Sequence, residues 1–553
     1  LADWQKPLVE LLARSFVDTN GKWDSEAYKK FLNDCAGDAS FLNAVDFRTV
    51  SFVSFLNLAV LAGVFVIITL TLSKFQGKLY TYSFIILSIA MTASGIQNTS
   101  VIKSEYTAAV ESGTMNEVEI EPLFHLSKNA RNVVVFMLDR AESQFVEEMF
   151  TESPDFYDTF TGFTFYPNTV SFNGHTMMGA PLIFGGYEYQ PFEMNRRKDE
   201  LLYKKTNEAI LMLPRIFTEQ ADFNAVITDP SWANYSQYAD LSITEPYEKI
   251  SGFQTIGKYS RKWYKNHSSG QTLDNTDDLL KHNLFIFSIF RSSPVVLREV
   301  IYLKGKYWNS NAKQLSYMNV INNLAPLEFL PELTNFTDSA EGTYVCMVNE
   351  LTHSSTFMQA PDYTPSAEIT DYGTSRFNKQ SAYHTNMAAF KRDAGWINLL
   401  KKNGVYDNTR IILVADHGRT TYEDCMEKDS ELDNKIAGDR YRGRGHFHPL
   451  LMVKDFNARE RLKTDMTFMT NGDVPSLAVK GIVSSPVNPF TGKEVPSDTQ
   501  EIKKNGVTVT SSDIHQAWLY RDEYTYKIRD DQWWHVKDDV FKASSWSQEI
   551  HQD

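Results

Sequence analysis

Five short apolar runs recur after residue 130 of the 553-residue chain, and each run stops at a polar cluster. Short continuous runs of Val, Ile and Leu are typical of strands buried on both faces of a parallel sheet. Amphipathic stretches lie between them, and residues 386–402 are one, ending at Asn403-Gly404. This alternation predicts an α/β fold with a doubly wound, mostly parallel sheet flanked by helices. The five runs are Val133–Leu138, Ala225–Thr228, Tyr344–Val348, Ile411–Ala415 and Leu450–Val453.

Two uncharged stretches near the start of the chain predict transmembrane helices. Residues 49–73 hold 25 residues without a charge and residues 79–102 hold 24, whereas a membrane helix needs about 20 apolar residues. The link between them carries Lys74 and Lys78 and no acid, so the positive-inside rule places it in the cytoplasm. Residues 1–48 and the chain after about 103 are then expected outside the cell. Because the sequence begins at Leu1, we expect further membrane helices upstream.

The charge of the chain belongs to its outer part. The formal net charge is -14, but residues 1–110 hold nine Lys or Arg and nine Asp or Glu, which cancel. An acidic outer part disfavours a nucleic-acid partner. Three cysteines without a CxxC pair disfavour a zinc ribbon, a redox pair and a disulfide framework. We expect an extracellular loop (1–48), two transmembrane helices (49–102), a juxtamembrane linker (103–129), a catalytic domain (130–484) and a C-terminal extension (485–553).

Acidic residues and histidine follow several of the predicted strands. In folds of this class ligands bind outside the carboxyl ends of the strands. The run IILVADHG places Asp416 and His417 there, where a carboxylate and an imidazole can share one metal ion. Asp139 follows NVVVFML and Asp229 follows AVIT, in equivalent positions. Taken singly, each motif is also compatible with a polar turn or with an Asp that caps a helix.

A threonine precedes an apolar stretch in the segment NTVSFNGHTMMGAPLIFGGY, which spans residues 168–187. Placed at a helix N-terminus, Thr176 would meet free backbone N–H groups and the positive end of the helix dipole, an environment that binds phosphate. A coordinated metal would lower the pKa of its hydroxyl and make Thr176 a nucleophile. The alternative is an ordinary N-cap threonine.

Histidines and arginines supply further candidates for substrate binding. His353 lies in LTHSST, and His446 and His448 lie in YRGRGHFHP. These histidines are candidates for substrate or leaving-group contacts or for a metal site, and His175 is a further candidate for substrate binding. Arg442 and Arg444 are candidates for holding a pair of phosphate oxygens. The alternative for each histidine is a surface or core position.

Taken together and in this order, these segments resemble the alkaline phosphatase superfamily. More narrowly, they resemble its membrane-anchored branch of lipoteichoic acid synthases and phosphoethanolamine transferases. The segment 168–187 and the block NVVVFMLDRAES are most similar to phosphoglycerol transferases that decorate Gram-positive cell-surface polysaccharides. The resemblance covers about residues 130–482, because TNGDVPSLAVKGI at 470–482 is similar to the closing segment of the sulfatase-like domain.

The resemblance implies one divalent metal ion, Mn²⁺ with Zn²⁺ or Mg²⁺ as alternatives. Its implied ligands are Asp139, Thr176, Asp416 and His417, with Thr176 also the nucleophile. His353 falls near a family histidine that contacts the head group of the substrate. A leaving-group histidine falls near His446, and His448 is an equally fair candidate.

Three departures from the family pattern limit what the resemblance implies. Lipoteichoic acid synthases often carry Glu where this chain has Asp139. The Asp side chain is shorter than that of Glu by one methylene, so the ligand arm is shorter here. The common THxP pattern is THSS at residues 352–355. The CxPSR-type motif that true sulfatases need is absent, so sulfatase activity is not expected.

The sequence therefore predicts an extracellular phosphotransferase on a multi-pass membrane protein. The resemblance implies that it moves glycerol phosphate from a membrane phospholipid, phosphatidylglycerol, through a phospho-threonine to a cell-surface polysaccharide or glycolipid. The alternatives are a phosphoethanolamine transferase, a phosphodiesterase of the same fold and a non-catalytic relative that binds lipid.

Overall fold

The computed structural model describes residues 119–549, with gaps at 237–239, 268–311, 367, 420–423, 438–442 and 513–519. Isolated positions are also described within 268–311 and between residues 59 and 89. The predicted loop at 1–48, both predicted membrane helices and most of the linker at 103–129 otherwise lie outside the described residues. Among the residues that are described, no helix is both long and apolar enough to span a membrane. Residues 120–263 and 319–553 form one compact unit, which contains every element of the site.

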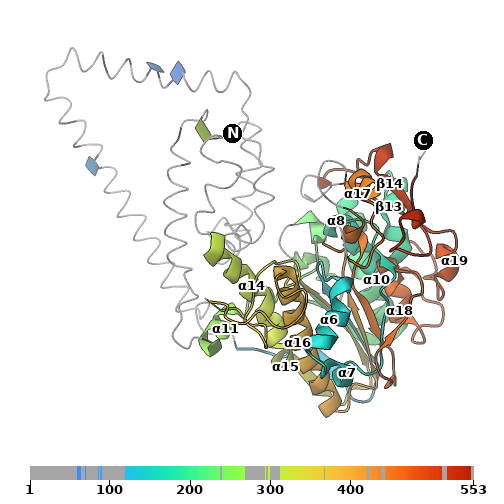
Figure 1. Cartoon of the computed structure of the whole chain (residues 1–553). Coiled ribbons are helices and arrows are strands. Elements are labelled where there is room, and N and C mark those ends of the chain that lie inside the picture. The colour runs from blue at the N-terminus through green and yellow to red at the C-terminus, as the bar shows by residue number, and fades with distance from the viewer. Residues whose placement is uncertain are drawn as a thin grey trace. The chain divides into compact units, whose positions relative to one another are not determined.

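An eight-stranded sheet runs through this unit (Figure 1). Its central strands β2, β8 and β9 have no exposed residue, as expected for strands covered on both faces. In spatial order the strands are β11 (Lys463–Thr464), β3 (Phe163–Phe165), β10 (Leu451–Lys454), β9 (Thr409–Val414), β2 (Asn132–Leu138), β8 (Gly342–Asn349), β5 (Phe223–Thr228) and β6 (Ile250–Phe253).

The prediction of a mostly parallel α/β sheet is confirmed, with one correction. Strands β9, β2, β8, β5 and β6 are parallel to one another. Strand β10, the last of the five predicted strands, is antiparallel to both β9 and β3. An apolar run alone carries no direction, because it reports burial and not the sense of the chain. The short strand β3 and the two edge strands β6 and β11 were not predicted.

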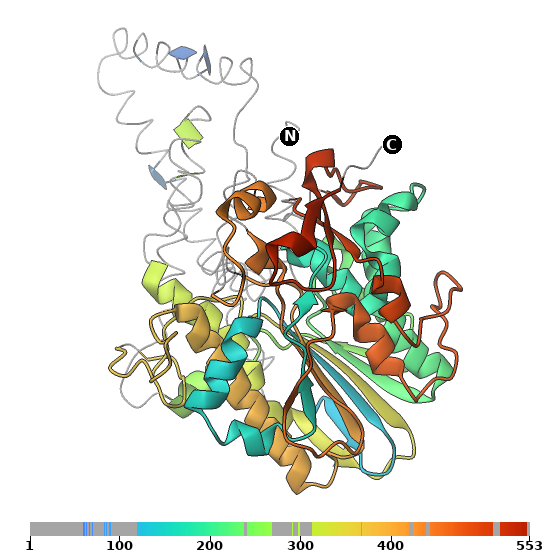
Figure 2. The same cartoon turned by 45° about the vertical axis from the view of Figure 1, so that its right-hand side comes forward.

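Helices cover both faces of the sheet (Figure 2). One face packs against α8 (Thr176–Gly185), α10 (Leu202–Gln220) and α18 (Val474–Val479), through Val133, Val135 and Met137 of β2. The other face lies under α6 (Val146–Glu152), α7 (Phe156–Thr159), α15 (Leu330–Leu333) and α16 (Ser381–Lys402). There Phe136 contacts Trp396, with ring centroids 5.0 Å apart. Helix α16 begins five residues before the predicted start, with Ala382 and Tyr383 already buried.

The remaining elements are short or lie at the periphery of the sheet. Strands β1 (Phe124–Ser127) and β7 (Thr334–Thr337) form a parallel pair, as do β4 (Thr169–Val170) and β12 (Met469–Thr470). The other helices are α9 (Pro191–Arg196), α11 (Ser260–His267), α14 (Ala312–Glu328), α17 (Ser430–Ala437) and α19 (Gln500–Lys503).

The C-terminal segment packs against the part of the chain that leads to Thr176. It forms an antiparallel sheet of β13 (Val507–Thr510), β14 (Trp533–Val536) and β15 (Trp546–Gln548). Trp534 and Trp546 share a core cluster with Phe172 and Phe447. The Asn173 side chain donates hydrogen bonds to Thr510 O and Ser512 O at 2.6 and 3.1 Å. Residues 507–512 and 533–548 therefore support the approach to α8.

Candidate metal-dependent active site

The register of three adjacent strands brings the predicted ligands to one edge of the sheet. Strand β2 lies between β8 and β9, with Leu138 opposite Asn349 and Met137 opposite Val414. Asp139 therefore leaves the sheet at the same level as Asp416 and Glu350. Asp229 does not join them, because β8 separates β5 from β2. Its carboxylate instead accepts hydrogen bonds from the backbone N–H groups of Thr255 and Ile256.

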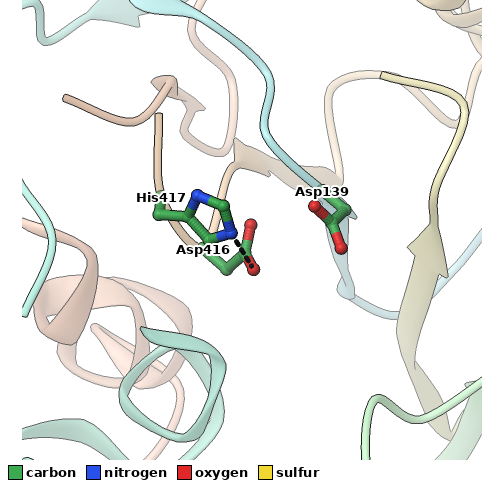
Figure 3. A group of neighbouring side chains, drawn as sticks. All are labelled: Asp139, Asp416 and His417. Carbon is green, nitrogen blue, oxygen red and sulfur yellow. Dashed lines mark ion pairs between the residues drawn. The ribbon is translucent and has the colours of Figure 1, made fainter. Parts of the chain in front are cut away.

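Asp139, Asp416 and His417 form a compact buried trio (Figure 3). One ligand atom of each residue lies within 4.8 Å of the corresponding atoms of the other two. Their exposed fractions are 4%, 0% and 1%. Figure 3 shows the Asp416 carboxylate beside the His417 ring, with Asp139 across from both. Two carboxylates and an imidazole at this spacing match the donor set of a divalent cation.

The trio leaves two buried carboxylate oxygens without a hydrogen bond. Asp139 Oδ1 and Asp416 Oδ2 accept none within the described part of the chain, and His417 Nε2 lies 3.5 Å from the latter. Burial, followed by the charges of Asp416 and Glu350, raises the pKa of Asp139 well above its ordinary value. Burial likewise raises the pKa of Asp416. Buried, unsatisfied carboxylates are costly unless a cation accompanies them, so these residues fit a bound metal ion.

The tautomer of His417 suits metal ligation. Its Nδ1 lies 2.6 Å from Gly418 O, and a carbonyl oxygen only accepts hydrogen bonds, so Nδ1 carries the proton. The lone pair then resides on Nε2, the atom on the side of Asp416. Ligating histidines commonly donate their other ring N–H in this way, which fixes the orientation of the ring.

Thr176 is the first residue of α8, and its hydroxyl reaches the trio. His175, with φ -141° and ψ 142°, is still extended, and the ten-residue helix begins immediately after it. Thr176 Oγ1 donates a hydrogen bond to Asp139 Oδ2 at 3.2 Å. The N–H groups at the start of the helix and the helix dipole favour negative charge at this end. The helix therefore presents a hydroxyl beside the carboxylates in an environment suited to an anion.

Close backbone packing holds α8 against the strand end that carries Asp416. A Cβ atom on Gly179 would lie 2.6 Å from Asp416 O, so only glycine allows this approach. Asn471 donates from one amide nitrogen to Gly179 O at 3.1 Å and to Asp416 O at 2.9 Å. Sequence reasoning missed Asn471. The signal was the Thr470…Asp473 spacing, which forms a capping box around the 3₁₀ helix η7 (Asn471–Asp473).

A second tight contact places His446 next to the segment that leads to Thr176. The 3₁₀ helix η6 (Arg444–Phe447) accepts a 2.9 Å hydrogen bond from Gly418 N at His446 O. A Cβ atom on Gly174 would lie 3.1 Å from His446 Cβ. His446 thus borders both the Asp416-His417-Gly418 turn and the approach to Thr176.

The other predicted histidines occupy different environments. The His175 ring lies 6.2 Å from the His417 ring. Burial and the charges of Arg140 and Arg419 hold the pKa of His353 well below its ordinary value, so its imidazole is neutral near pH 7. His448 is buried, with Nε2 2.6 Å from Pro167 O and its ring 5.2 Å from the Phe541 ring.

Of the two arginines predicted to bind phosphate, the structure describes only Arg444. Arg442 lies outside the described residues. Arg444 is fully buried, and its guanidinium forms an ion pair with Asp433, with Nε 2.9 Å from Oδ1. The structure therefore gives the Arg444 side chain an internal carboxylate partner and does not bring it to the trio.

Neither a family model nor a curated protein matches the chain. Among solved structures, a protein in the alkaline phosphatase superfamily from Vibrio parahaemolyticus is similar at 11% identity, with 76% of this chain and 81% of that chain covered and a TM-score of 0.34. Lipooligosaccharide phosphoethanolamine transferase A from Neisseria meningitidis is similar at 10% identity, with coverages of 81% and 78% and a TM-score of 0.31. The C-terminal periplasmic domain of EcEptC from Escherichia coli, in complex with Zn, is similar at 10% identity, with coverages of 63% and 82% and a TM-score of 0.31. Likenesses at these TM-scores carry no weight for function, which has to be argued from the residues of the site.

Proposed function

We propose that this chain is an extracellular, metal-dependent phosphotransferase of the alkaline phosphatase superfamily. The observation that carries the proposal is the hydroxyl of Thr176, which stands at the start of α8 and donates to Asp139 within the buried trio. A nucleophilic hydroxyl, a helix N-terminus and a metal-binding donor set together suit transfer of a phosphoryl group.

Asp139, Asp416 and His417 would hold the metal, and Thr176 would complete its ligand set. We propose Mn²⁺, with Zn²⁺ or Mg²⁺ as alternatives, because oxygen donors outnumber the single imidazole nitrogen. When bound, such an ion lowers the pKa of a coordinated hydroxyl and offsets negative charge on phosphoryl oxygens. The two carboxylate oxygens that accept no hydrogen bond support this assignment.

The reaction we propose has two steps, and the chain supplies the nucleophile and the acid. In the first, Thr176 Oγ1 gives its proton to Asp139 Oδ2, the oxygen to which it donates, and forms a bond to the phosphorus of phosphatidylglycerol, while the bond between phosphorus and the diacylglycerol oxygen breaks. His446, which borders the segment leading to Thr176, donates a proton to the departing oxygen. In the second, a hydroxyl of a surface polysaccharide or glycolipid gives its proton to His446 and displaces Thr176 Oγ1 from phosphorus, and Asp139 returns the proton to Thr176 Oγ1. We prefer His446 to His448 because the Nε2 of His448 is engaged by Pro167 O.

A lipid donor is proposed on the basis of the resemblance and of the apolar stretches at 49–73 and 79–102. An enzyme anchored in the membrane shares a surface with its donor, which raises the effective concentration of that donor. The acceptor is proposed as a cell-surface glycan or glycolipid on the outer side of the same membrane.

Release of diacylglycerol from phosphatidylglycerol tests the proposal. The full chain, loaded with Mn²⁺ in mixed vesicles, should release diacylglycerol, and Thr176→Ala should release none. Thr467→Ala is a suitable control, because Thr467 lies on an exposed loop where its hydroxyl bonds only to Asp465. If Thr176→Ala retained the activity of the unmodified chain, the nucleophile assignment would be wrong.

Phosphoethanolamine transfer is a second candidate, and one residue favours it. Glu350 is exposed and follows β8, and its charge raises the pKa of Asp139, which places the two carboxylates near one another. An exposed carboxylate beside the site suits the ammonium group of ethanolamine better than it suits uncharged glycerol. Separate incubations with labelled phosphatidylglycerol and phosphatidylethanolamine decide between the candidates by which lipid yields diacylglycerol.

A further inference from the structure

Arg140 turns the chain immediately after the first carboxylate of the trio. Its φ of 61° is in the left-handed region, which non-glycine residues seldom occupy. Its backbone N–H donates to Asp416 Oδ1 at 3.1 Å, so the turn is tied directly to the second carboxylate. The backbone of Arg140 therefore helps to hold Asp416 in place, and the Arg140 side chain extends from a position next to the trio.

The Arg140 guanidinium lies close to the trio. Its positive charge lowers the pKa of both Asp139 and Asp416, against the effect of burial, and also lowers the pKa of His353. Coulombic effects weaken with distance, so one cation that acts on all three groups lies near all three. The guanidinium therefore lies near both carboxylates and near His353.

The same guanidinium has an unmet requirement for an acceptor. Arg140 Nε is buried and has no hydrogen-bond partner in the part of the chain that the structure describes. A buried donor without a partner costs free energy, and the cost is larger for a charged group. Other arginines in this region are engaged: Arg444 by Asp433, and Arg419 by His353 O at 2.9 Å.

We propose that Arg140 binds the phosphoryl oxygens of the substrate. This inference rests on the proposed function, and it assigns the contact that the sequence had suggested for Arg442 and Arg444. Guanidinium donors form a planar fork that matches two oxygens of a phosphate group, and such charge-assisted bonds are stronger than neutral ones. A phosphate group would satisfy the buried Nε and would bring an anion to a site whose own carboxylates otherwise repel it.

Inorganic phosphate is a probe for this contact that does not depend on the donor or the acceptor. Phosphate binding to the full chain is measured by calorimetry in the presence of Mn²⁺, and metal content per chain is measured in parallel. Arg140→Gln should weaken phosphate binding by about 10- to 100-fold with metal content unchanged. Arg140→Lys should give an intermediate loss, because it keeps the charge and loses the fork. Arg215→Gln is the matched control, since Arg215 is also largely buried (20% exposed) but is paired with Glu219 on α10.

The outcomes separate this inference from the proposed function. If the unmodified chain binds phosphate and Arg140→Gln binds it within about twofold, the role of Arg140 is overturned and the proposed function stands. If the unmodified chain with its metal binds no phosphate, both are overturned. Should Arg140→Gln lose the metal or fail to fold, Arg140→Lys decides: weakened phosphate binding with metal retained supports the contact, and unchanged binding overturns it.

Discussion

Asn471 joins two parts of the active site that are far apart in the chain. One amide nitrogen donates both to Gly179 O in the nucleophile helix and to Asp416 O at the end of β9. The distance between Thr176 and the trio therefore depends on a residue that contacts neither the nucleophile nor a ligand side chain. Asn471 is a positioning residue in this account.

Asn471→Ala should weaken metal binding as well as the fold. The substitution removes the donor that two buried carbonyl oxygens share, so the free energy of unfolding should fall by about 1–3 kcal/mol. The metal dissociation constant should rise, because α8 and the Asp416 turn lose their common support. Calorimetric titration with Mn²⁺ measures this, with Asn335→Ala on an exposed position of β7 as the control. An unchanged metal affinity in Asn471→Ala would show that the bridge does not position the site.

Metal binding should stabilise the protein more at neutral pH than at acid pH. The pKa values of Asp139 and Asp416 are raised in the folded, metal-free chain, so the folded state holds more protons than the unfolded state above the ordinary pKa of 3.8. Stability of the metal-free chain is then lost as pH rises through the folded pKa values. A bound cation offsets the free-energy cost of holding Asp139 and Asp416 ionised in the folded chain.

The measurement is thermal unfolding with and without Mn²⁺ at pH 5 and pH 7.5. The increase in Tm on adding metal should be larger at pH 7.5. Asp139→Asn should stabilise the metal-free chain at pH 7.5 and abolish the response to metal. An equal metal response in Asp139→Asn and in the unmodified chain would remove Asp139 from the ligand set.

A buried carboxylate away from the trio should make stability pH-dependent on its own. Asp393 of α16 is 1% exposed and neither of its oxygens has a hydrogen-bond partner in the described structure. Burial raises its pKa to about 8. The folded state favours the protonated form of Asp393. The stability that this protonated side chain contributes is therefore lost between about pH 4 and pH 8 as the pH rises. Asp393→Asn should stabilise the chain by about 2–5 kcal/mol at pH 8 and by little at pH 4, as measured by urea unfolding at both values; a pH-independent difference would contradict the assignment.

Arg444 is expected to act on stability and not directly on the substrate. Removing one partner of a buried ion pair leaves an uncompensated charge, so Arg444→Met should cost about 3–5 kcal/mol. The double variant Arg444→Met with Asp433→Leu should recover much of that loss, because both charges are then removed. Urea unfolding of these two variants and of the unmodified chain checks the prediction. If Arg444→Met left stability unchanged but raised the KM for the donor lipid, the result would contradict this account and support the phosphate contact predicted from the sequence.

The C-terminal sheet should be required for an ordered nucleophile. Trp546 is 5% exposed and packs on Phe447 of η6, with ring centroids 5.6 Å apart. Trp546→Ala should destabilise the chain by about 3–5 kcal/mol and should also reduce diacylglycerol release at temperatures where the protein stays folded. Ile502→Ala, at a position of α19 that is 43% exposed, is the control. Full activity in a folded Trp546→Ala variant would limit the role of this sheet to stability.

The sequence was most informative where burial and chemistry coincide. The runs at β2, β8 and β9 predicted fully buried strands, and the polar residues after them predicted the trio, because neighbouring parallel strands end at one edge. The antiparallel direction of β10 was not predictable, since an apolar run reports burial alone. The ion pair between Arg444 and Asp433 was likewise not predictable from the sequence, because tertiary packing brings the two residues together.

Asn471 and Arg140 show a second limit of sequence reasoning. The capping spacing around Asn471 indicates a helix start, but the two carbonyl oxygens that it joins come from residues 179 and 416. Arg140 follows a predicted ligand in the sequence. That its Nε is buried without a hydrogen-bond partner in the described structure depends on where the arrangement of β2, β8 and β9 places it. Roles that depend on contacts between distant segments emerge only when those segments are placed in space.

Trapping the covalent intermediate tests the central claim most directly. The full chain with Mn²⁺ is incubated with phosphatidylglycerol in the absence of an acceptor, and the quenched protein is examined by peptide mass spectrometry. The account predicts one glycerophosphoryl group on Thr176, and none on any peptide of Thr176→Ala. Release of diacylglycerol with no adduct on Thr176, or with the adduct on another residue, would contradict it.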